Sequence, residues 1–352
     1  MSWLGHLHLQ YRSVASDHGP RTVAHDRHDG PLRVLQALYP ESPGICHHVL
    51  VHPPGGIVGG DELHIDVDVQ AGAHALITTP GATRFYRSAG PLATQAARLR
   101  VDADARLEWL PLETLAHDGC RARNTLRLEL AEGASMIGWD ILALGLPASG
   151  QPLRSGCFEQ QIDWPAHWLE QTRLDFDDPV QASLTHRLLA SPLGWSGRSV
   201  LVTAWCAARP AWSSQATQAL TEDARSALSA HLPTHLPTHL PAHPPAHLSA
   251  HLPTDAAAMG APPLAVERFP ASASGTVAQV PAAACTPPSL PLPPSPPSPP
   301  SWGVTSPHLG LVVARLLVHR TEGAWPALQA IRAAWRQRLW ALPDVRPRVW
   351  RT

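Results

Sequence analysis

The stretch from Leu63 to Gln70 alternates apolar and polar residues without a break. Its apolar members are Leu63, Ile65, Val67 and Val69, and its polar members are His64, Asp66, Asp68 and Gln70. A period of two sets every apolar side chain on one face of an extended chain, which predicts a half-buried strand. Thr125 to Leu130 repeats the pattern, and shorter strands are predicted at 74–78, 99–101 and 107–110.

The region between Asp61 and Asp140 shows no convincing helical period. A doubly wound α/β fold needs a helix between successive parallel strands, so that fold is disfavoured. The predicted fold class is mostly β, with an antiparallel or coiled arrangement of strands.

The C-terminal segment has a helical pattern instead. Its apolar stripe consists of Trp325, Leu328, Ile331, Trp335 and Leu339, and Arg332, Arg336 and Arg338 lie largely off that stripe. Thr321 is the predicted N-cap, Pro326 fits only in the first turn, and Pro343 marks the end.

Residues 231–301 differ in composition from the rest of the chain, because they are rich in proline and histidine and end in SLPLPPSPPSPPS. Dense proline removes backbone donors, which predicts an extended, disordered insert. Residues 1–230 and 302–352 then form a single β domain with a C-terminal helix. We expect the two ends of the insert to lie close together.

Six histidines of the insert recur every four residues: His231, His235, His239, His243, His247 and His251. Neutral imidazoles bind nickel and zinc well, so the tract suggests a metal-gathering segment or a His-rich nickel-binding or storage protein. Against this, four-residue spacing aligns ligands only on a helix, which the prolines forbid, and repeat expansion also produces such tracts.

Composition excludes several classes of function. The 27 basic and 28 acidic residues give a net charge of −1, which lacks the excess of positive charge that nucleic-acid binding needs. There is no lysine, so Schiff-base chemistry is excluded. The five cysteines are scattered and never spaced C-x-x-C. Without a leader or a membrane-length apolar run, we expect a soluble cytoplasmic protein.

The segment His52 to Asp61, HPPGGIVGGD, contains four glycines in six positions directly before a predicted strand. A P-loop needs a lysine and a following helix, so nucleotide binding is disfavoured. The glycines are better explained by positive φ and close backbone approach at a tight turn. Asp61 is left with either a capping or a functional role.

A second segment, Thr78 to Ser88, mixes hydroxyl groups, guanidinium groups and aromatic rings. It fits either a polar recognition edge, or a sheet end plugged by aromatic rings with locally paired arginines. A hydrolase is an alternative interpretation, because scattered acidic and imidazole groups could act as a base and as the group that orients it. These groups are His47, His48, His52, His117, Asp118, Asp140 and Glu170. No catalytic spacing connects them, and none of the known hydrolase motifs occurs.

The two segments together, HPPGGIVGGDELHIDV followed by TTPGATRFYRS, resemble the signature of the UreD (UreH) family of urease accessory proteins. The signature positions are Pro54, Gly55, Gly56, Gly59, Gly60, Thr79, Pro80, Gly81, Tyr86 and Arg87. The resemblance continues through LEWLPLETLAHDGCRARN, GWDILALGLPASG and the terminal PRVWRT.

This resemblance implies stacked β-sheets in a solenoid-like arrangement, with helices near the C-terminus. It also implies a non-catalytic scaffold that binds urease apoprotein and the accessory protein UreF, while UreF docks the GTPase UreG. Nickel is then a transient cargo, and no tightly bound cofactor is expected. The carboxylates that resemble the family's nickel passage are Asp61, Asp140 and Glu170.

The chain departs from the family pattern at two positions. Leu146 precedes Pro147 where family members commonly have an Arg-Pro pair, and Leu112 replaces a polar residue. Any surface contact that family members make through polar groups at these two positions is therefore not expected in this chain.

Overall fold

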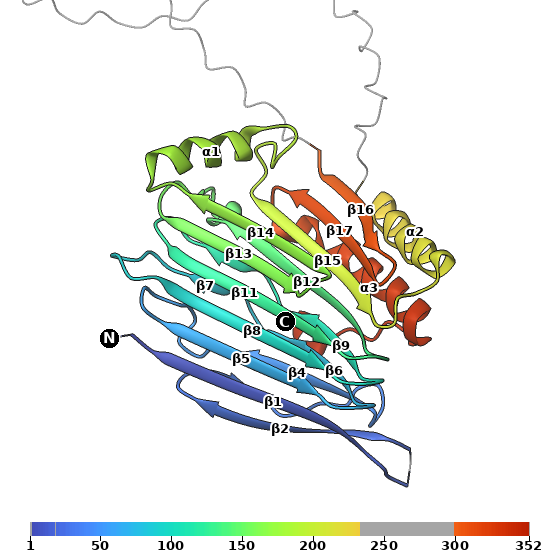
Figure 1. Cartoon of the computed structure of the whole chain (residues 1–352). Coiled ribbons are helices and arrows are strands. Elements are labelled where there is room, and N and C mark those ends of the chain that lie inside the picture. The colour runs from blue at the N-terminus through green and yellow to red at the C-terminus, as the bar shows by residue number, and fades with distance from the viewer. Residues whose placement is uncertain (1, 18, 233–298, 352) are drawn as a thin grey trace, which may run out of the picture. The chain divides into compact units, whose positions relative to one another are not determined.

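Two facing β-sheets form the body of the fold in the residues that the computed structural model describes, which are 2–17, 19–232 and 299–351 (Figure 1). The seven-stranded sheet has the order β14 (Trp168–Asp175), β13 (Cys157–Trp164), β11 (Arg121–Leu130), β8 (Ala93–Val101), β5 (Glu62–Val69), β1 (Leu4–Val14), β2 (Arg21–Asp29). Eight strands of the ten-stranded sheet follow the order β16 (Ser301–His308), β17 (Leu311–Val318), β15 (Val200–Ala208), β12 (Ser135–Leu144), β9 (Arg106–Leu110), β6 (His74–Thr78), β4 (Ile45–Val51), β3 (Arg33–Val34). The other two lie off this path: β10 (Thr114–Ala116) pairs with β12, and β7 (Thr83–Phe85) pairs with β10.

From β4 to β13 the chain coils, because the long strands alternate between the two sheets. Within each sheet, successive strands of this region pair in parallel, as β5 with β8 and β6 with β9. Residues 62–144 are all described, and they contain no helix. The prediction of a mostly β, stacked and solenoid-like fold is confirmed. Each strand predicted from the alternation overlaps an observed one, although Gln70 lies one residue beyond the end of β5.

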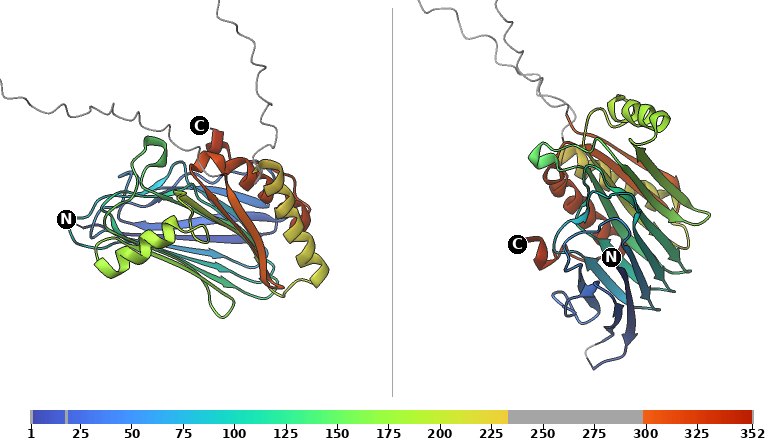
Figure 2. Two further views of the ribbon diagram at one scale, coloured as in Figure 1. Left: turned by 90° about the horizontal axis from the view of Figure 1, so that it is seen from above. Right: turned by 90° about the vertical axis from the view of Figure 1, so that its left-hand side faces the viewer.

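The main hydrophobic core fills the space between the sheets. The period of two explains it, because Leu63, Ile65 and Val67 of β5 are buried while His64 and Asp66 face outward. A second core lies on the opposite face of the ten-stranded sheet, which α2 (Ser214–His231) and α3 (Trp325–Trp340) cover (Figure 2).

The remaining elements are short or peripheral. Helix α1 (Pro179–Ala190) follows β14, and the three 3₁₀ helices are η1 (Pro147–Ser149), η2 (Thr321–Gly323) and η3 (Arg348–Arg351). No helix in the described part of the chain is long and apolar enough to cross a membrane. The four described cysteines, Cys46, Cys120, Cys157 and Cys206, are free.

The segments that flank residues 233–298 lie next to each other. The indole nitrogen of Trp302 donates a hydrogen bond to the carbonyl oxygen of Leu232 at 3.0 Å. Helix α2 extends through His231, one residue into the predicted insert, and β16 begins at Ser301. The two ends are therefore close, as expected for an excursion from one domain.

Helix α3 occupies the predicted place, and its apolar stripe packs on the sheet. The predicted N-cap was wrong: Thr321 begins η2, and α3 starts after Ala324 without a side-chain cap. Pro326 lies in the first turn, as predicted. The helix ends at Trp340 because Ala341 adopts a left-handed conformation with φ of 53°, before Pro343 is reached.

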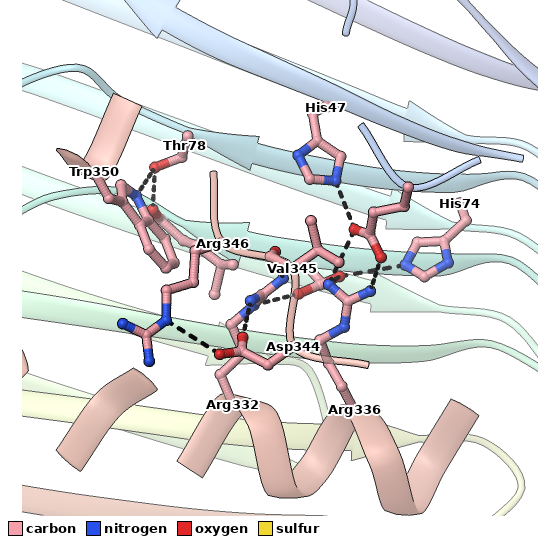
Figure 3. Close-up of polar contacts among 12 residues, drawn as sticks. His47, His74, Thr78, Arg332, Arg336, Asp344, Val345, Arg346 and Trp350 are labelled. Carbon is pink, nitrogen blue, oxygen red and sulfur yellow. Dashed lines mark hydrogen bonds and ion pairs between the residues drawn. The ribbon is translucent and has the colours of Figure 1, made fainter. Parts of the chain in front are cut away.

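The positions of Arg332 and Arg336 correct the sequence analysis. Both were predicted to lie largely off the apolar stripe, yet both side chains are fully buried beneath the helix (Figure 3). Arg332 Nε lies 2.7 Å from the carboxylate of Glu108 on β9, and Arg336 Nη1 lies 3.2 Å from the same group. Arg336 also pairs with Glu41, whose carboxylate lies 2.8 Å from His47.

This charged cluster fastens α3 to the sheet. Burial alone would raise the pKa of Glu108, but Arg332, His74 and Arg336 outweigh it and hold the pKa at about 2. Arg332 reaches Asp344 beyond the helix as well, at 2.8 Å. Arg338 behaves as predicted, since it is exposed and pairs with Asp223 of α2.

We expect Arg332→Met to lower the free energy of unfolding by about 3–5 kcal/mol, because it leaves the buried Glu108 carboxylate without its nearest counter-charge. Urea denaturation followed by tryptophan fluorescence measures the change. Arg338→Met, in the same helix but in an exposed pair, is the control and should cost less than about 1 kcal/mol. Equal losses for the two variants would contradict this view of the cluster.

Candidate functional site

The two signature segments pack directly on each other. A Cβ atom added at Gly56 would lie 2.0 Å from the ring of Tyr86, so only glycine fits there. The amide of Ile57 donates to the carbonyl of Arg84 at 2.7 Å, and the amide of Tyr86 donates to the carbonyl of Ile57 at 2.9 Å. Gly55 has a φ of +78°, as the turn prediction requires.

The second segment fits the structural interpretation of its sequence, a sheet end plugged by aromatic rings with a locally paired arginine. Phe85 is fully buried and packs edge-on against Phe158, so it plugs the sheet end. Arg87 pairs with Asp118 at 3.3 Å. Thr79 Oγ1 accepts a hydrogen bond from the amide of Leu112 at 2.9 Å, which holds the loop over the cavity described next.

A cavity of about 290 Å³ opens beneath both segments. The first segment contributes His52, Gly55, Gly56 and Ile57, and the second contributes residues 79–84. From the inner faces of the strands, the polar side chains of Gln95, Asn124 and Asp140 reach the cavity. The signature loops therefore roof a space with an aspartate in its wall.

Asp140 begins a polar row on the inner face of the ten-stranded sheet. It lies directly opposite Thr203 in the antiparallel pairing of β12 with β15. Thr203 lies in turn opposite Arg315 in the pairing of β15 with β17. Neighbours on these strands, such as Leu142 and Val313, are apolar and belong to the core between the sheets.

A second polar row runs across the seven-stranded sheet. Asn124 of β11 is in register with Gln95 of β8 and with Gln160 of β13. Gln95 donates to Asn124 at 3.2 Å, and Asn124 donates to Gln160 at 3.2 Å. Gln160 Nε2 then donates to Asp140 Oδ1 at 3.0 Å, which joins the row to the facing sheet.

Glu170 of β14 makes a second link between the two sheets. Its Oε1 accepts a hydrogen bond from Thr203 Oγ1 at 3.0 Å, and its Oε2 accepts from Arg315 Nε at 2.9 Å. The side chain of Glu170 is 16 % exposed and that of Arg315 is 41 % exposed. We call Gln95, Asn124, Gln160, Asp140, Thr203, Glu170 and Arg315 the inner polar layer; it runs from the cavity to the exposed side of Arg315.

The surroundings of Asp140 favour its protonated form. Burial raises the pKa of the carboxyl group and the nearby Glu170 raises it further, while the hydrogen bond from Gln160 lowers it, with a result of about 7. At neutral pH the protonated and the ionised forms of this carboxyl group are therefore both populated.

The layer contains oxygen donors but no closed metal site. In the described residues, no three His, Cys, Asp or Glu side chains meet in a way that would hold an ion. Asp140 and Glu170, with the hydroxyl group of Thr203 between them, place carboxylate and hydroxyl oxygens in one row. Such ligands bind hard and borderline divalent cations and release them more easily than a thiolate or imidazole cage does.

Asp61 lies outside this layer and does not line the cavity. Its Oδ1 accepts a hydrogen bond from the amide of Trp3 at 2.9 Å, and its Oδ2 accepts from the amide of Val58 at 3.0 Å. The first bond ties the glycine-rich turn to the residue before strand β1, and the second lies within the turn. Of the three predicted passage carboxylates, the structure brings Asp140 and Glu170 together and leaves Asp61 behind the loop, near His52.

The structure adds five residues that the sequence analysis did not single out: Gln95, Asn124, Gln160, Thr203 and Arg315. One signal was present, because each interrupts an otherwise apolar inward series, as Asn124 does between Ala122 and Leu126. Of the predicted histidine ligands, His231 ends α2. The other five lie outside the described residues.

The fold and this interior define a solenoid-like β protein with a carboxylate-bearing internal cavity. Comparison with known proteins gives the family. The model of the UreD urease accessory protein family matches residues 4–351. The chain is 48 % identical to a urease accessory protein UreD of Methylibium petroleiphilum and 47 % identical to one of Leptothrix cholodnii, over all of both chains in each case.

A third relative, the urease accessory protein UreD of Variovorax paradoxus, is 41 % identical over the full length of both chains. The chain belongs to the UreD family of urease accessory proteins. The predicted family is confirmed.

Asp140 makes stability depend on pH. Because its pKa in the folded chain is about 7 and the ordinary value is 3.8, folding binds a proton, and this contribution falls as pH rises through that range. The measured quantity is the difference in free energy of unfolding between the wild type and Asp140→Asn. This difference should fall by roughly 2 kcal/mol between pH 5.5 and pH 8. Urea titrations at each pH measure it, and a pH-independent difference would contradict the assignment.

Asp61→Ala should lower the free energy of unfolding by about 1–3 kcal/mol, because two partly buried hydrogen bonds to a buried carboxylate are lost. The amides of Trp3 and Val58 should also exchange hydrogen for deuterium faster than in the wild type. Asp66→Ala, on the outer face of the strand that begins directly after Asp61, is the control. A stability unchanged in Asp61→Ala would return this residue to a purely functional role.

Proposed function

We propose that this chain is a non-catalytic urease maturation factor that conducts nickel through its interior. In this proposal it bridges urease apoprotein and the UreF/UreG accessory complex in the cytoplasm, and nickel is a transient cargo. The single observation that carries the proposal is the position of Asp140. It lies where the cavity roofed by both signature segments meets the inner polar layer.

The chemistry of the layer suits transfer better than storage. An ion on a path must bind at each station strongly enough to enter and weakly enough to leave. The layer supplies two carboxylates, those of Asp140 and Glu170, beside neutral amide groups and the hydroxyl group of Thr203. Asp140 can release its proton when a cation arrives and recover it when the cation leaves, since its pKa is about 7.

The proposal assigns different roles to the three carboxylates. Asp140 is the first station below the signature loops, and Glu170 is the second, at the other end of the layer. Asp61 acts indirectly, because its two backbone contacts set the shape of the loop that roofs the cavity. Partner binding belongs to the outer surfaces, which these substitutions do not alter.

The test is nickel loading of urease. Asp140→Asn should lower the nickel content and activity of co-expressed urease at least tenfold, because the neutral amide cannot balance the charge of a divalent cation. Co-purification with urease and UreF should be unchanged. Nickel is measured by atomic emission on the purified urease.

Asp163→Asn is the matched control, since Asp163 lies on β13 but faces outward and pairs with Arg127 at 3.2 Å. It should activate urease as the wild type does. Normal loading with Asp140→Asn would refute conduction past this residue. Loss of co-purification in that variant would instead assign Asp140 a structural role.

The histidine tract is an alternative means of supplying nickel, and deletion of residues 233–298 distinguishes it from conduction through the interior. Because Trp302 contacts Leu232, we expect a short linker to span the two ends of the deletion. We expect urease activation by the shortened chain to stay within about twofold of the full chain at ample nickel. Total loss of activation would favour the storage hypothesis.

A further inference from the structure

Arg315 is the one cation within the inner polar layer, and it occupies one end of it. Its guanidinium group contacts both carboxylate oxygens of Glu170, with Nε at 3.1 Å from Oε1 and 2.9 Å from Oε2, and Nη2 also bonds Oε2. Thr203 adds a third donor to Oε1. Both oxygens of Glu170 are thus engaged by donors.

The position of this pair in the fold is unlike that of an ordinary surface ion pair. Arg315, Thr203 and Asp140 occupy directly opposite positions on three neighbouring strands. Glu170 reaches them from the facing sheet. The side chain of Arg315 is 41 % exposed whereas that of Glu170 is only 16 % exposed, so solvent reaches the arginine more than the carboxylate.

The charges of the layer point to a function for this arrangement. The charged groups that face one another here are Asp140, Glu170 and Arg315, while Gln95, Asn124, Gln160 and Thr203 are neutral. Without the guanidinium group, two carboxylates would be left close to each other, which suits a divalent cation. With it, one of the two carboxylates is already neutralised and its oxygens are occupied.

We propose that Arg315 is a built-in counter-cation that closes the Glu170 end of the layer to divalent cations until the guanidinium group is drawn away. This rests on the proposed function, because it specifies how the same path is controlled. The exposed side of Arg315 lets a carboxylate on a docked protein compete with Glu170 for it. Release then couples to docking, and an undocked chain does not lose its cargo from this end.

Cation binding to the purified full-length chain tests the proposal. The probe is Mn²⁺, which prefers carboxylate oxygens, so that the histidine tract competes little for it. Free Mn²⁺ is measured by electron paramagnetic resonance during titration at pH 8. We expect Arg315→Met to bind Mn²⁺ at least tenfold more tightly than the wild type, because Glu170 becomes available beside Asp140.

Two further variants separate charge from packing. Arg315→Lys keeps the positive charge and should bind Mn²⁺ within twofold of the wild type. The double variant Glu170→Gln/Arg315→Met removes the released carboxylate and should also return to the wild-type affinity. If Arg315→Met does not unfold cooperatively, Arg315→Gln, which retains a polar side chain, carries the same comparison.

An unchanged affinity in Arg315→Met would overturn the proposal, as would tight binding that persists in the double variant. These outcomes are independent of urease activation. A failure of Asp140→Asn to impair nickel loading would refute conduction while leaving the Mn²⁺ result intact. An unchanged Mn²⁺ affinity with impaired nickel loading would refute the role of Arg315 alone.

Discussion

The register between neighbouring strands within each sheet is the constraint on which this structure depends. Each turn of the coil places one strand in each sheet, and side chains in register must share the same environment. A lone polar side chain in the space between the sheets would lose its water without gaining a partner. Polar residues therefore occur there as rows across neighbouring strands, and the two rows meet where Gln160 bonds Asp140.

The same chain contains another buried charged cluster, which differs from the inner polar layer in its exposure to solvent and in the pKa of its carboxyl group. Beneath α3, Arg332 and Glu108 have no exposed side-chain surface, and the pKa of Glu108 is held at about 2. That cluster is shielded from solvent and its carboxylate stays ionised at neutral pH, which suits a role in holding α3 on the sheet. In the inner layer, Asp140 borders a cavity and its pKa is about 7, so its charge is free to change.

The strands and the final helix were predictable because their signals are local. Alternation from Leu63 to Gln70 marks a strand whatever its neighbours are. The buried arginines were not predictable in this way, since Arg332 meets Glu108 across 224 residues of sequence. The inner layer depends equally on register between distant strands. The family resemblance pointed to Asp61, Asp140 and Glu170, but only the fold shows that Asp61 bonds the backbone of the loop and lies outside the layer.

Anomalous X-ray diffraction from crystals of the chain soaked in nickel tests the central claim most directly. Data collected on both sides of the nickel absorption edge locate the ion without assumptions about its ligands. We expect an anomalous peak in the cavity beneath the signature loops, within coordination distance of the Asp140 carboxylate. Nickel peaks confined to the outer surface, with none in the cavity, would contradict it.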